Sequence, residues 1–491
     1  GEKRMSLELM HESMEDWNRK VSAAEEMMPV IGRLFREHAI ETSIFGRLLN
    51  NRTVINIVKC CRLARQVEDE EITVHEAQAV LQAIQDIELK PCHIDLGKFA
   101  VNFREFGNGK SLSEYVTYEL ENATGRAATE SDRKTDIVLY GFGRIGRLLA
   151  RELIAKSGSK EAIRLRAIVV RKNGDNDLIK RASLLRRDSV HGSFNGTITT
   201  DHDTNAIIAN GQRIQLIYAN DPSEIDYTDF GIQNALVVDN TGKWRDREGL
   251  LLHLQCKGAS RVLLTAPGKG DLKNVVHGVN HYEITDADAI ISAASCTTNA
   301  ITPVLAVIDE KYGIQNGHVE TVHSYTNDQN LIDNFHTGDR RGRAAALNMV
   351  MTETGAATAV AKALPKLKGK LTGNAIRVPT PNVSMAILNL NLETPVEASE
   401  LNDYLRYIAV HSKLQKQIDY SNSPEAVSSD FVGSRAAGIV DGLATIANGN
   451  KSCVIYVWYD NEYGYSCQVI RCLRQMTKAT LPAYPIANQH N

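Results

Sequence analysis

The hydrophobic and polar positions of this 491-residue chain follow one period up to about residue 131 and another after it. In the first part, apolar residues recur three or four positions apart from Leu7 to Phe35, with charged residues between them. This spacing predicts a long amphipathic helix that packs within its own domain or, alternatively, pairs with another subunit. A second helix is predicted from the capping box Thr73-Val-His-Glu76 to Pro91. Residues 1–131 are therefore expected to form an all-α N-terminal extension.

After the small and polar stretch 122–132, which is typical of a linker, short apolar strands alternate with helical segments. Strands are expected at 135–140, 165–170, 235–242 and 261–267, because each range contains a run of branched apolar residues. This alternation predicts a parallel, doubly wound α/β sheet. In such a sheet, ligands bind beyond the carboxyl ends of the strands.

The first of these strands runs directly into Gly141-Phe-Gly-Arg-Ile-Gly146, and a helical segment follows. Glycines at these positions permit a tight turn and let the backbone approach a pyrophosphate, whose charge the helix N-terminus favours. The alternative is a glycine-rich turn without a ligand. The strand–loop–helix context favours a dinucleotide site, formed by Gly141, Phe142, Gly143, Arg144, Ile145 and Gly146.

The second strand ends in Arg171-Lys172, where an acidic residue for the ribose hydroxyls is expected. A cationic pair suits a 2′-phosphate, so NADP is slightly favoured over NAD. In the alternative, the pair is a solvated basic loop, and Asp175 or Asp177 binds the ribose. Further walls of the cofactor site are expected at the strand ends that contain Thr241, Gly242 and Thr265.

Cys296 lies between an apolar run and a segment with helical spacing, and therefore at a predicted helix N-terminus. The helix dipole lowers the pKa of a thiol at such a place, which makes Cys296 a candidate nucleophile. The alternative is an inert buried thiol. His323, at the end of a predicted strand, is the candidate base. Downstream, 340–343, 352–355 and 374–381 supply guanidinium, hydroxyl and glycine N–H groups suited to phosphate oxygens.

Composition adds few restrictions. The length suits about three domains. The net charge is -3, 43% of the residues are hydrophobic, and no apolar run approaches the ~18 residues of a membrane span, so we expect neither nucleic acid nor membrane as a partner. The first residues lack the apolar core of a secretory signal. Because the eight cysteines contain no C-x-x-C pair, we expect no metal site and a reducing cytoplasm as the location.

Six motifs occur in the order found in phosphorylating glyceraldehyde-3-phosphate dehydrogenases, and the chain from about 136 to 476 resembles that family. They occupy 141–147, 188–192, 294–299, 321–326, 371–383 and 458–465. The resemblance implies a Rossmann-type dinucleotide-binding domain at 132–296 and an α+β catalytic domain at 297–460. It also implies a C-terminal segment, 461–491, whose helix returns to the dinucleotide-binding domain. The extension 1–131 is not covered by the resemblance.

The resemblance also implies roles for individual residues. Cys296 is expected to be the nucleophile and His323 its base. Asn461 is expected to bind the nicotinamide carboxamide, and Tyr465 to border that ring. Groups for the substrate phosphate are expected at Thr326, Arg341 and Arg377. Groups for the attacking inorganic phosphate are expected at Ser295, Thr297, Thr354 and Gly355.

The implied reaction is the oxidative phosphorylation of glyceraldehyde 3-phosphate to 1,3-bisphosphoglycerate with NAD or NADP, through a cysteine thioester, in glycolysis or gluconeogenesis. A cytoplasmic homotetramer is expected from the resemblance. One alternative is an erythrose-4-phosphate dehydrogenase. Another is a family member whose helical extension gives it a regulatory or scaffolding role. One departure from the family pattern is the absence of the usual acidic residue after the second strand, where Arg171 lies; the uncovered extension 1–131 is the more important one.

Overall fold

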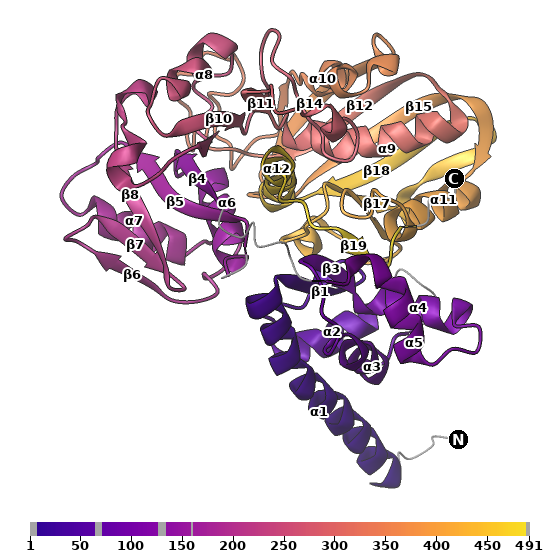
Figure 1. Ribbon diagram of the computed structural model, residues 1–491. Helices are drawn as coiled ribbons and strands as arrows, with labels where there is room; N and C mark the ends of the chain where they lie inside the picture. Colours follow the sequence, from indigo (N-terminus) through magenta and orange to yellow (C-terminus); the bar gives the residue numbers. More distant parts are fainter. Residues whose placement is uncertain (1–6, 64–70, 126–133, 159–160, 488–491) are drawn as a thin grey trace. The chain divides into compact units, whose positions relative to one another are not determined.

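The computed structural model describes residues 7–63, 71–125, 134–158 and 161–487 (Figure 1). The chain divides into two compact units. The first comprises Gly1–Arg133, Gly158–Glu161 and Leu481–Asn491, and the second comprises Lys134–Ser157 and Ala162–Thr480. Both ends of the chain therefore belong to the first unit.

The second unit contains the predicted doubly wound sheet, in the order β11-β10-β9-β4-β5-β8-β7-β6. Six strands are parallel: β4 (Thr135–Tyr140), β5 (Ile163–Val170), β8 (Gln212–Tyr218), β9 (Ala235–Asp239), β10 (Ala259–Leu264) and β11 (Ile290–Ser292). The edge strands β6 (Ile198–Asp201) and β7 (Ala206–Ala209) are antiparallel. The connecting helices are α6 (Arg144–Ala155), α7 (Asp177–Arg186) and α8 (Arg247–Leu254).

Alternate residues of β4 enter two different cores. Ile137 and Leu139 pack with α6 and α7, whereas Val138 and Tyr140 pack into the core on the other side. Because successive side chains of a strand point to opposite faces, the sheet is buried on both faces. The predicted α/β fold of this part is confirmed.

A second sheet follows, in the order β13-β14-β12-β15-β18-β17-β16. Its strands are β12 (Ile314–Ser324), β13 (Val350–Thr352), β14 (Leu371–Val378), β15 (Ser384–Glu397), β16 (Ile418–Ser421), β17 (Gly438–Asp441) and β18 (Ile446–Tyr459). Its helices are α9 (Cys296–Tyr312), α10 (Ala356–Ala363) and α11 (Ala398–His411) (Figure 1). On β15, Leu388 and Leu390 pack in one core with α9, whereas Asn389 and Asn391 on the opposite face are exposed. One face of the sheet is thus covered by helices, as an α+β domain requires.

The last helix, α12 (Tyr463–Met476), packs with the dinucleotide-binding sheet. Val469 and Leu473 are buried in the same core as Leu139. The chain then leaves this unit, because β19 (Ala483–Tyr484) pairs in parallel with β3 (Cys92–Asp95) of the first unit. The C-terminal segment expected at 461–491 is therefore divided between the two units.

The first unit is mainly helical, with α1 (Leu7–His38), α2 (Val54–Leu63), α3 (Val74–Ile84), α4 (Leu96–Phe106) and α5 (Leu112–Glu119). It also contains a four-stranded sheet, β19-β3-β1-β2, built from β1 (Ile40–Ile44), β2 (Arg47–Leu48), β3 (Cys92–Asp95) and β19. The helical character and the capping box at Thr73 are confirmed, but the prediction of an all-α extension is wrong. These strands are very short, and β3 finds its second partner at the far end of the chain, so no local pattern marks them.

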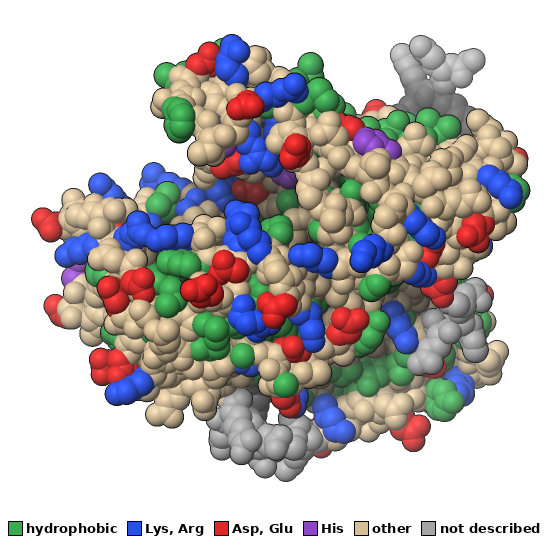
Figure 2. Space-filling view, turned by 90° about the horizontal axis from the view of Figure 1, so that it is seen from above, with side chains coloured by type: hydrophobic (Ala, Val, Ile, Leu, Met, Phe, Trp, Pro, Cys, Tyr) green, Lys and Arg blue, Asp and Glu red, His purple; other side chains and the backbone are tan. Residues whose placement is uncertain are grey.

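The apolar stripe of α1 is only partly buried. Ala24 and Ile31 lie in the core of the first unit, whereas Met10, Met14 and Trp17 are exposed. The prediction that the stripe packs within its own domain therefore holds for the second half of the helix alone. Within the described ranges, none of the helices is both long and apolar enough to span a bilayer. On the face shown in Figure 2, Lys and Arg side chains are interspersed with Asp and Glu.

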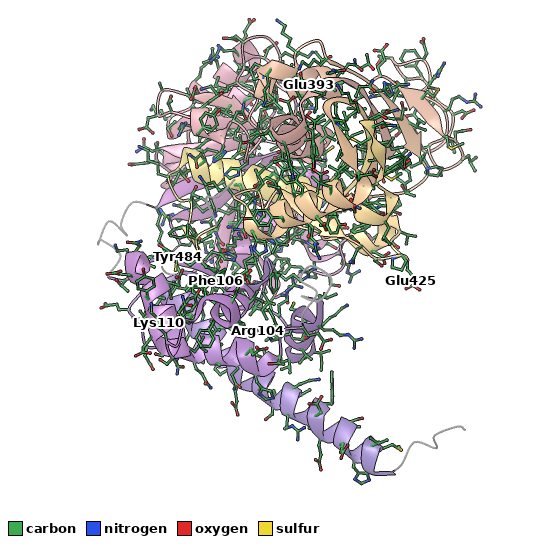
Figure 3. The ribbon with its side chains drawn as sticks, turned by 90° about the vertical axis from the view of Figure 1, so that its right-hand side faces the viewer. Arg104, Phe106, Lys110, Glu393, Glu425 and Tyr484 are labelled. Atoms are coloured by element: carbon green, nitrogen blue, oxygen red, sulfur yellow. The ribbon has the colours of Figure 1, made fainter. Side chains whose placement is uncertain are left out.

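Tyr484, labelled in Figure 3, is the last residue of β19, and its side chain is buried in the core of the first unit. We expect Tyr484→Ala to destabilise this unit by about 3 kcal/mol, because a large aromatic side chain leaves a cavity when truncated. Hydrogen exchange of the β3 and α4 amides measures the loss, with the amides of β4 as the internal reference. Ile486→Ala is the control, since Ile486 is 55% exposed. Equal protection in both variants would contradict the prediction.

Candidate active site

The turn before Cys296 places the thiol at a helix N-terminus. The strand β11 ends at Ser292, and Ala294 then adopts a left-handed φ of 56°. The hydroxyl of Ser295 caps α9 by accepting the backbone N–H of Thr298 at 3.0 Å. Cys296 is therefore the first residue of α9, as the sequence predicts.

Cys296 faces His323, which lies in β12. The distance from Cys296 Sγ to His323 Nε2 is 3.5 Å. On the other side of the ring, Nδ1 lies 2.7 Å from the Ser324 carbonyl oxygen and 2.7 Å from Arg377 Nη1. These two neighbours favour different tautomers. In the tautomer that donates Nδ1–H to Ser324, the Nε2 lone pair faces the thiol and can accept its proton.

Burial controls the protonation of this pair. It lowers the pKa of His323 to about 3, and the nearby charge of Arg377 acts in the same direction. It raises the pKa of the Cys296 thiol, against the opposing effects of the Arg377 charge and hydrogen bonding to Thr297. The expectation of a thiol pKa lowered by the helix dipole is therefore wrong for the resting site, because the loss of hydration outweighs the dipole. A neutral thiol faces a neutral imidazole, so the base must take the proton.

Of the groups expected to bind the substrate phosphate, one contacts this pair directly. Arg377 is next to His323, and its buried Nε has no hydrogen-bond partner among the described residues. Arg341 donates to Asp328 at 2.9 Å and to Thr352 at 3.1 Å, and Thr326 also donates to Asp328. Burial lowers the pKa of Arg377, and so does the charge of Arg341. A bound anion would stabilise the charge of Arg377, which burial and the second guanidinium disfavour.

The residues expected to bind inorganic phosphate lie at two helix N-termini. Ser295 and Thr297 are at the start of α9, and Thr354 and Gly355 are at the start of α10, which packs against α9. The Thr297 hydroxyl lies 2.8 Å from the Tyr459 hydroxyl. Unpaired N–H groups at helix N-termini favour an anion, which is consistent with the expected role.

The glycine loop fits a dinucleotide. Gly141 adopts a φ of 97°, and a Cβ at Gly146 would lie 2.4 Å from the Gly141 carbonyl oxygen, so neither position accepts a side chain. A Cβ at Gly143 would meet nothing within 4 Å, which leaves the loop open to a ligand. The helix α6 begins at the next residue, Arg144, and its N-terminus points N–H groups at this opening. Phe142 and Ile145 complete the loop and contact the core of the sheet.

The strand end at which the ribose is expected carries the exposed cations predicted from the sequence. Arg171 and Lys172 follow β5 directly, and both are exposed. Asp177, one alternative for binding the ribose, is buried and accepts from the Asn173 backbone N–H at 3.2 Å and from Arg181 at 3.4 Å. Its carboxylate is therefore already engaged within the protein, whereas Asp175 is exposed.

The expected cofactor walls follow β9 and β10 at the carboxyl edge of the sheet. The Thr241 hydroxyl donates to Asp239 at 2.7 Å, and Gly242 follows with a φ of 66°. The Thr265 hydroxyl donates to the Asn240 side-chain oxygen at 3.0 Å. The structure thus places both threonines just beyond the carboxyl ends of two adjacent parallel strands.

The two residues expected near the nicotinamide follow β18. Asn461 is buried, and its side-chain oxygen accepts the Ser384 hydroxyl at 2.9 Å. Tyr465 is also buried, and its hydroxyl donates to the Ala294 carbonyl at 2.7 Å. Tyr465 therefore supports the turn that holds Cys296.

Three residues of the site were given no role by sequence reasoning: Asp328, Ser384 and Tyr459. The Tyr459 ring lies edge-on to His323, with the two ring centroids 6.0 Å apart. Tyr459 belongs to the motif at 458–465, so its position was a usable signal. Ser384 and Asp328 had none, because their partners lie on other strands and loops.

A Rossmann-type sheet with an open glycine loop, joined to an α+β domain that presents a cysteine and a histidine, defines a dinucleotide-dependent dehydrogenase. The comparisons with known proteins agree. Residues 135–247 match the family model "Glyceraldehyde 3-phosphate dehydrogenase, NAD binding domain", and residues 295–461 match the model of the C-terminal domain. The chain belongs to the glyceraldehyde-3-phosphate dehydrogenase family.

Three relatives describe how far the similarity extends. A glyceraldehyde-3-phosphate dehydrogenase-like protein of Pseudomonas aeruginosa is 62% identical over 461 residues, 94% of this chain and 100% of the relative. Glyceraldehyde-3-phosphate dehydrogenase 2 of Bacillus subtilis is 38% identical, over 70% of this chain and 97% of the relative. Chloroplastic glyceraldehyde-3-phosphate dehydrogenase A of Zea mays is 40% identical, over 73% of this chain and 87% of the relative. Of these three matches, the first is long enough to include most of the N-terminal extension.

Proposed function

We propose that this protein oxidises and phosphorylates glyceraldehyde 3-phosphate to 1,3-bisphosphoglycerate with NAD or NADP. The observation that carries the proposal is the arrangement of Cys296, His323 and Arg377. A thiol lies 3.5 Å from a neutral imidazole, and a buried guanidinium contacts the other side of that ring. A nucleophile, a base and an anion-binding group thus meet in one place.

The chemistry follows from these groups. His323 takes the thiol proton, and the Cys296 sulfur forms a bond to the aldehyde carbon. His323 returns the proton to the oxygen of this adduct and takes it again when that oxygen becomes a carbonyl. The bound dinucleotide supplies the hydride acceptor for this oxidation. The product is a thioester on Cys296.

Inorganic phosphate then completes the turnover. One phosphate oxygen bonds to the acyl carbon, the C–S bond breaks, and the Cys296 thiolate leaves. The acyl phosphate is released. Arg377 and Arg341 hold the substrate phosphate, while the N-termini of α9 and α10 hold the attacking one.

A steady-state assay of the full-length protein tests this proposal. NAD or NADP reduction is followed with glyceraldehyde 3-phosphate in the presence and absence of phosphate, with arsenate as its substitute. Erythrose 4-phosphate is assayed in parallel, and we expect the lower kcat/KM for it. If neither aldehyde supports reduction and Cys296 does not react with iodoacetate, the proposed function is wrong.

For the cofactor we propose a preference for NADP, carried by Arg171. We expect Arg171→Asp to raise the KM for NADP about tenfold or more, because a charged hydrogen bond to the 2′-phosphate is replaced by repulsion. Lys257→Asp makes the same charge change just before β10, at the opposite edge of the sheet, where Lys257 pairs with Asp226. An unchanged KM for NADP in Arg171→Asp would show that this side chain does not contact the cofactor.

We also propose a homotetramer in a reducing cytoplasm. Two observations support it. The loop after β12 exposes large apolar side chains that subunit contacts would bury: Leu331, Ile332, Phe335, Leu347 and Met349. In addition, all eight cysteines are free thiols. Size-exclusion chromatography with light scattering measures the subunit number.

A further inference from the structure

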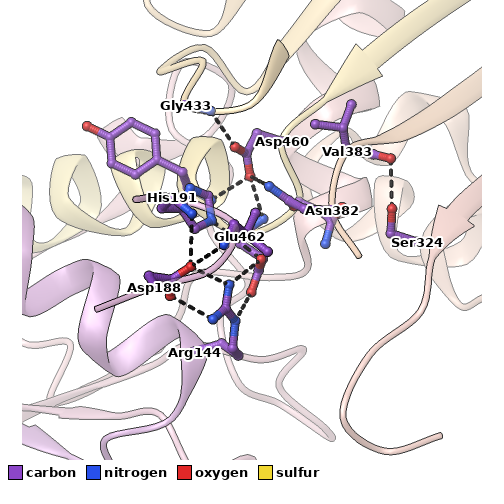
Figure 4. Close-up of polar contacts among 12 residues, drawn as sticks. Arg144, Asp188, His191, Ser324, Asn382, Val383, Gly433, Asp460 and Glu462 are labelled. Carbon is purple, nitrogen blue, oxygen red and sulfur yellow. Dashed lines mark hydrogen bonds and ion pairs between the residues drawn. The ribbon is translucent and has the colours of Figure 1, made fainter. Parts of the chain in front are cut away.

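The short turn 460–463 carries Asn461 and is fixed at each end by hydrogen bonds (Figure 4). The Asp460 carboxylate accepts the backbone N–H groups of Glu462 at 3.0 Å and Tyr463 at 2.7 Å. Its other oxygen accepts the Gly433 N–H at 2.8 Å. The backbone on both sides of Asn461 is therefore held by one buried carboxylate.

Glu462 ties this turn to the glycine loop. Its two carboxylate oxygens accept Arg144 Nε at 2.5 Å and Arg144 Nη2 at 2.9 Å. The same guanidinium donates to Asp188 at 2.6 Å, and Figure 4 shows Arg144 between the two acids. Arg144 is the first residue of α6, in the loop that the proposed function assigns to the pyrophosphate. A bidentate arginine fixes direction as well as distance, so this ion pair holds the turn against the loop.

Ser384 fixes the side chain of Asn461. The backbone N–H of Ser324 donates to the Ser384 oxygen at 3.1 Å, and the Ser384 hydroxyl donates to the Asn461 side-chain oxygen at 2.9 Å. Ser384 is 1% exposed, so water does not compete for these bonds. With its oxygen engaged, the Asn461 amide directs its NH₂ group away from Ser384, as a donor for a ligand carbonyl.

We propose that Ser384 and Glu462 are positioning residues for the nicotinamide carboxamide. Ser384 selects the orientation of the Asn461 side-chain amide in which its NH₂ group donates to the carboxamide. Glu462 holds the turn against the dinucleotide loop. The inference rests on the proposed function, and it adds two residues that act through Asn461 and Arg144. Ser384 also accepts the backbone N–H of Ser324, the residue after His323. One side chain therefore contacts both Asn461 and the neighbour of the proposed base.

Comparing two ligands isolates this role. The dinucleotide is the full ligand, and ADP-ribose lacks only the nicotinamide; for NADP the 2′-phosphorylated form is used. Both dissociation constants are measured by calorimetry for the wild type, Ser384→Ala and Glu462→Gln. We expect dinucleotide binding to weaken about five- to tenfold in each variant, the usual effect of one lost hydrogen bond. The dissociation constant for ADP-ribose should stay within about twofold of the wild-type value. Ser384→Thr, which keeps the hydroxyl, should restore the wild-type ratio of dinucleotide to ADP-ribose binding.

Asp201→Asn is the matched control, because it breaks the Arg213–Asp201 ion pair between β6 and β8 of the dinucleotide-binding sheet, whereas Ser384 and the strand before the turn belong to the other sheet. A general structural effect would weaken both ligands equally, and that result overturns the inference. A wild-type ratio of dinucleotide to ADP-ribose binding in both Ser384→Ala and Glu462→Gln also overturns the inference, while the proposed function stands. A wild type that binds the dinucleotide no better than ADP-ribose overturns the role of Asn461, and one that binds neither refutes the proposed function too.

Discussion

Cys296→Ser is expected to abolish dehydrogenase activity, lowering kcat by about 10⁴-fold or more. The serine hydroxyl is similar in size, but it is a far weaker nucleophile and acyl acceptor at neutral pH than a thiol whose proton His323 can take. Reduction of NAD or NADP with glyceraldehyde 3-phosphate and phosphate measures the loss. Dinucleotide binding should not change, because Cys296 contributes to chemistry rather than to the glycine loop.

Cys256→Ser is the matched control for this experiment. Cys256 is also buried, and its thiol donates to the Pro222 carbonyl, a bond that a hydroxyl can make in its place. We expect wild-type activity from this variant. Full activity in Cys296→Ser, or an equal loss in both variants, would refute the role of Cys296 as the nucleophile.

His323→Gln is expected to lower kcat/KM by about 10²- to 10⁴-fold at neutral pH, the usual contribution of a positioned base. Burial raises the pKa of the Cys296 thiol, so little thiolate forms at neutral pH without a base. Because the thiolate fraction grows with pH, the difference between wild type and variant should shrink as pH rises. Profiles of kcat/KM from pH 6 to 10 measure this trend.

His318→Gln is the control, because His318 lies on the same strand β12 and contacts Thr372 and Glu320 instead of the thiol. Its profile should match the wild type. A constant ratio between wild type and His323→Gln across the pH range would show that His323 does not act on the thiol proton.

The same histidine should affect stability in acid. The pKa of His323 is about 3 in the folded protein, below the ordinary value of 6.5. Its folded form therefore binds fewer protons than its unfolded form, and the wild type loses stability as pH falls from about 6.5 toward 3. The His323→Gln variant lacks this contribution, so its free energy of unfolding should fall less between about pH 6.5 and pH 3. Urea unfolding at pH 7 and pH 4.5 provides the comparison.

Much of the fold could be predicted because its signals are local. The glycine loop, the helix after it and the capping box at Thr73 each depend on residues within a few positions of one another. The order of the six motifs identified the family region, and Cys296 at the start of α9 followed from its position between a strand and a helix. Local periodicity and turn chemistry therefore determined the α/β core and brought Cys296 and His323 forward as candidates.

Other properties depend on partners that are distant in the sequence. The sheet of the extension needs β19, which lies at the other end of the chain from β1, and the Ser384–Asn461 bond joins residues 77 positions apart. The protonation of the thiol was predicted with the wrong direction, since the helix dipole is visible in the sequence and burial is not. By itself the sequence determined the local elements, the family motifs and the candidate chemistry. Only the tertiary structure decided pairing, burial and protonation, because these depend on which distant groups exclude water from one another.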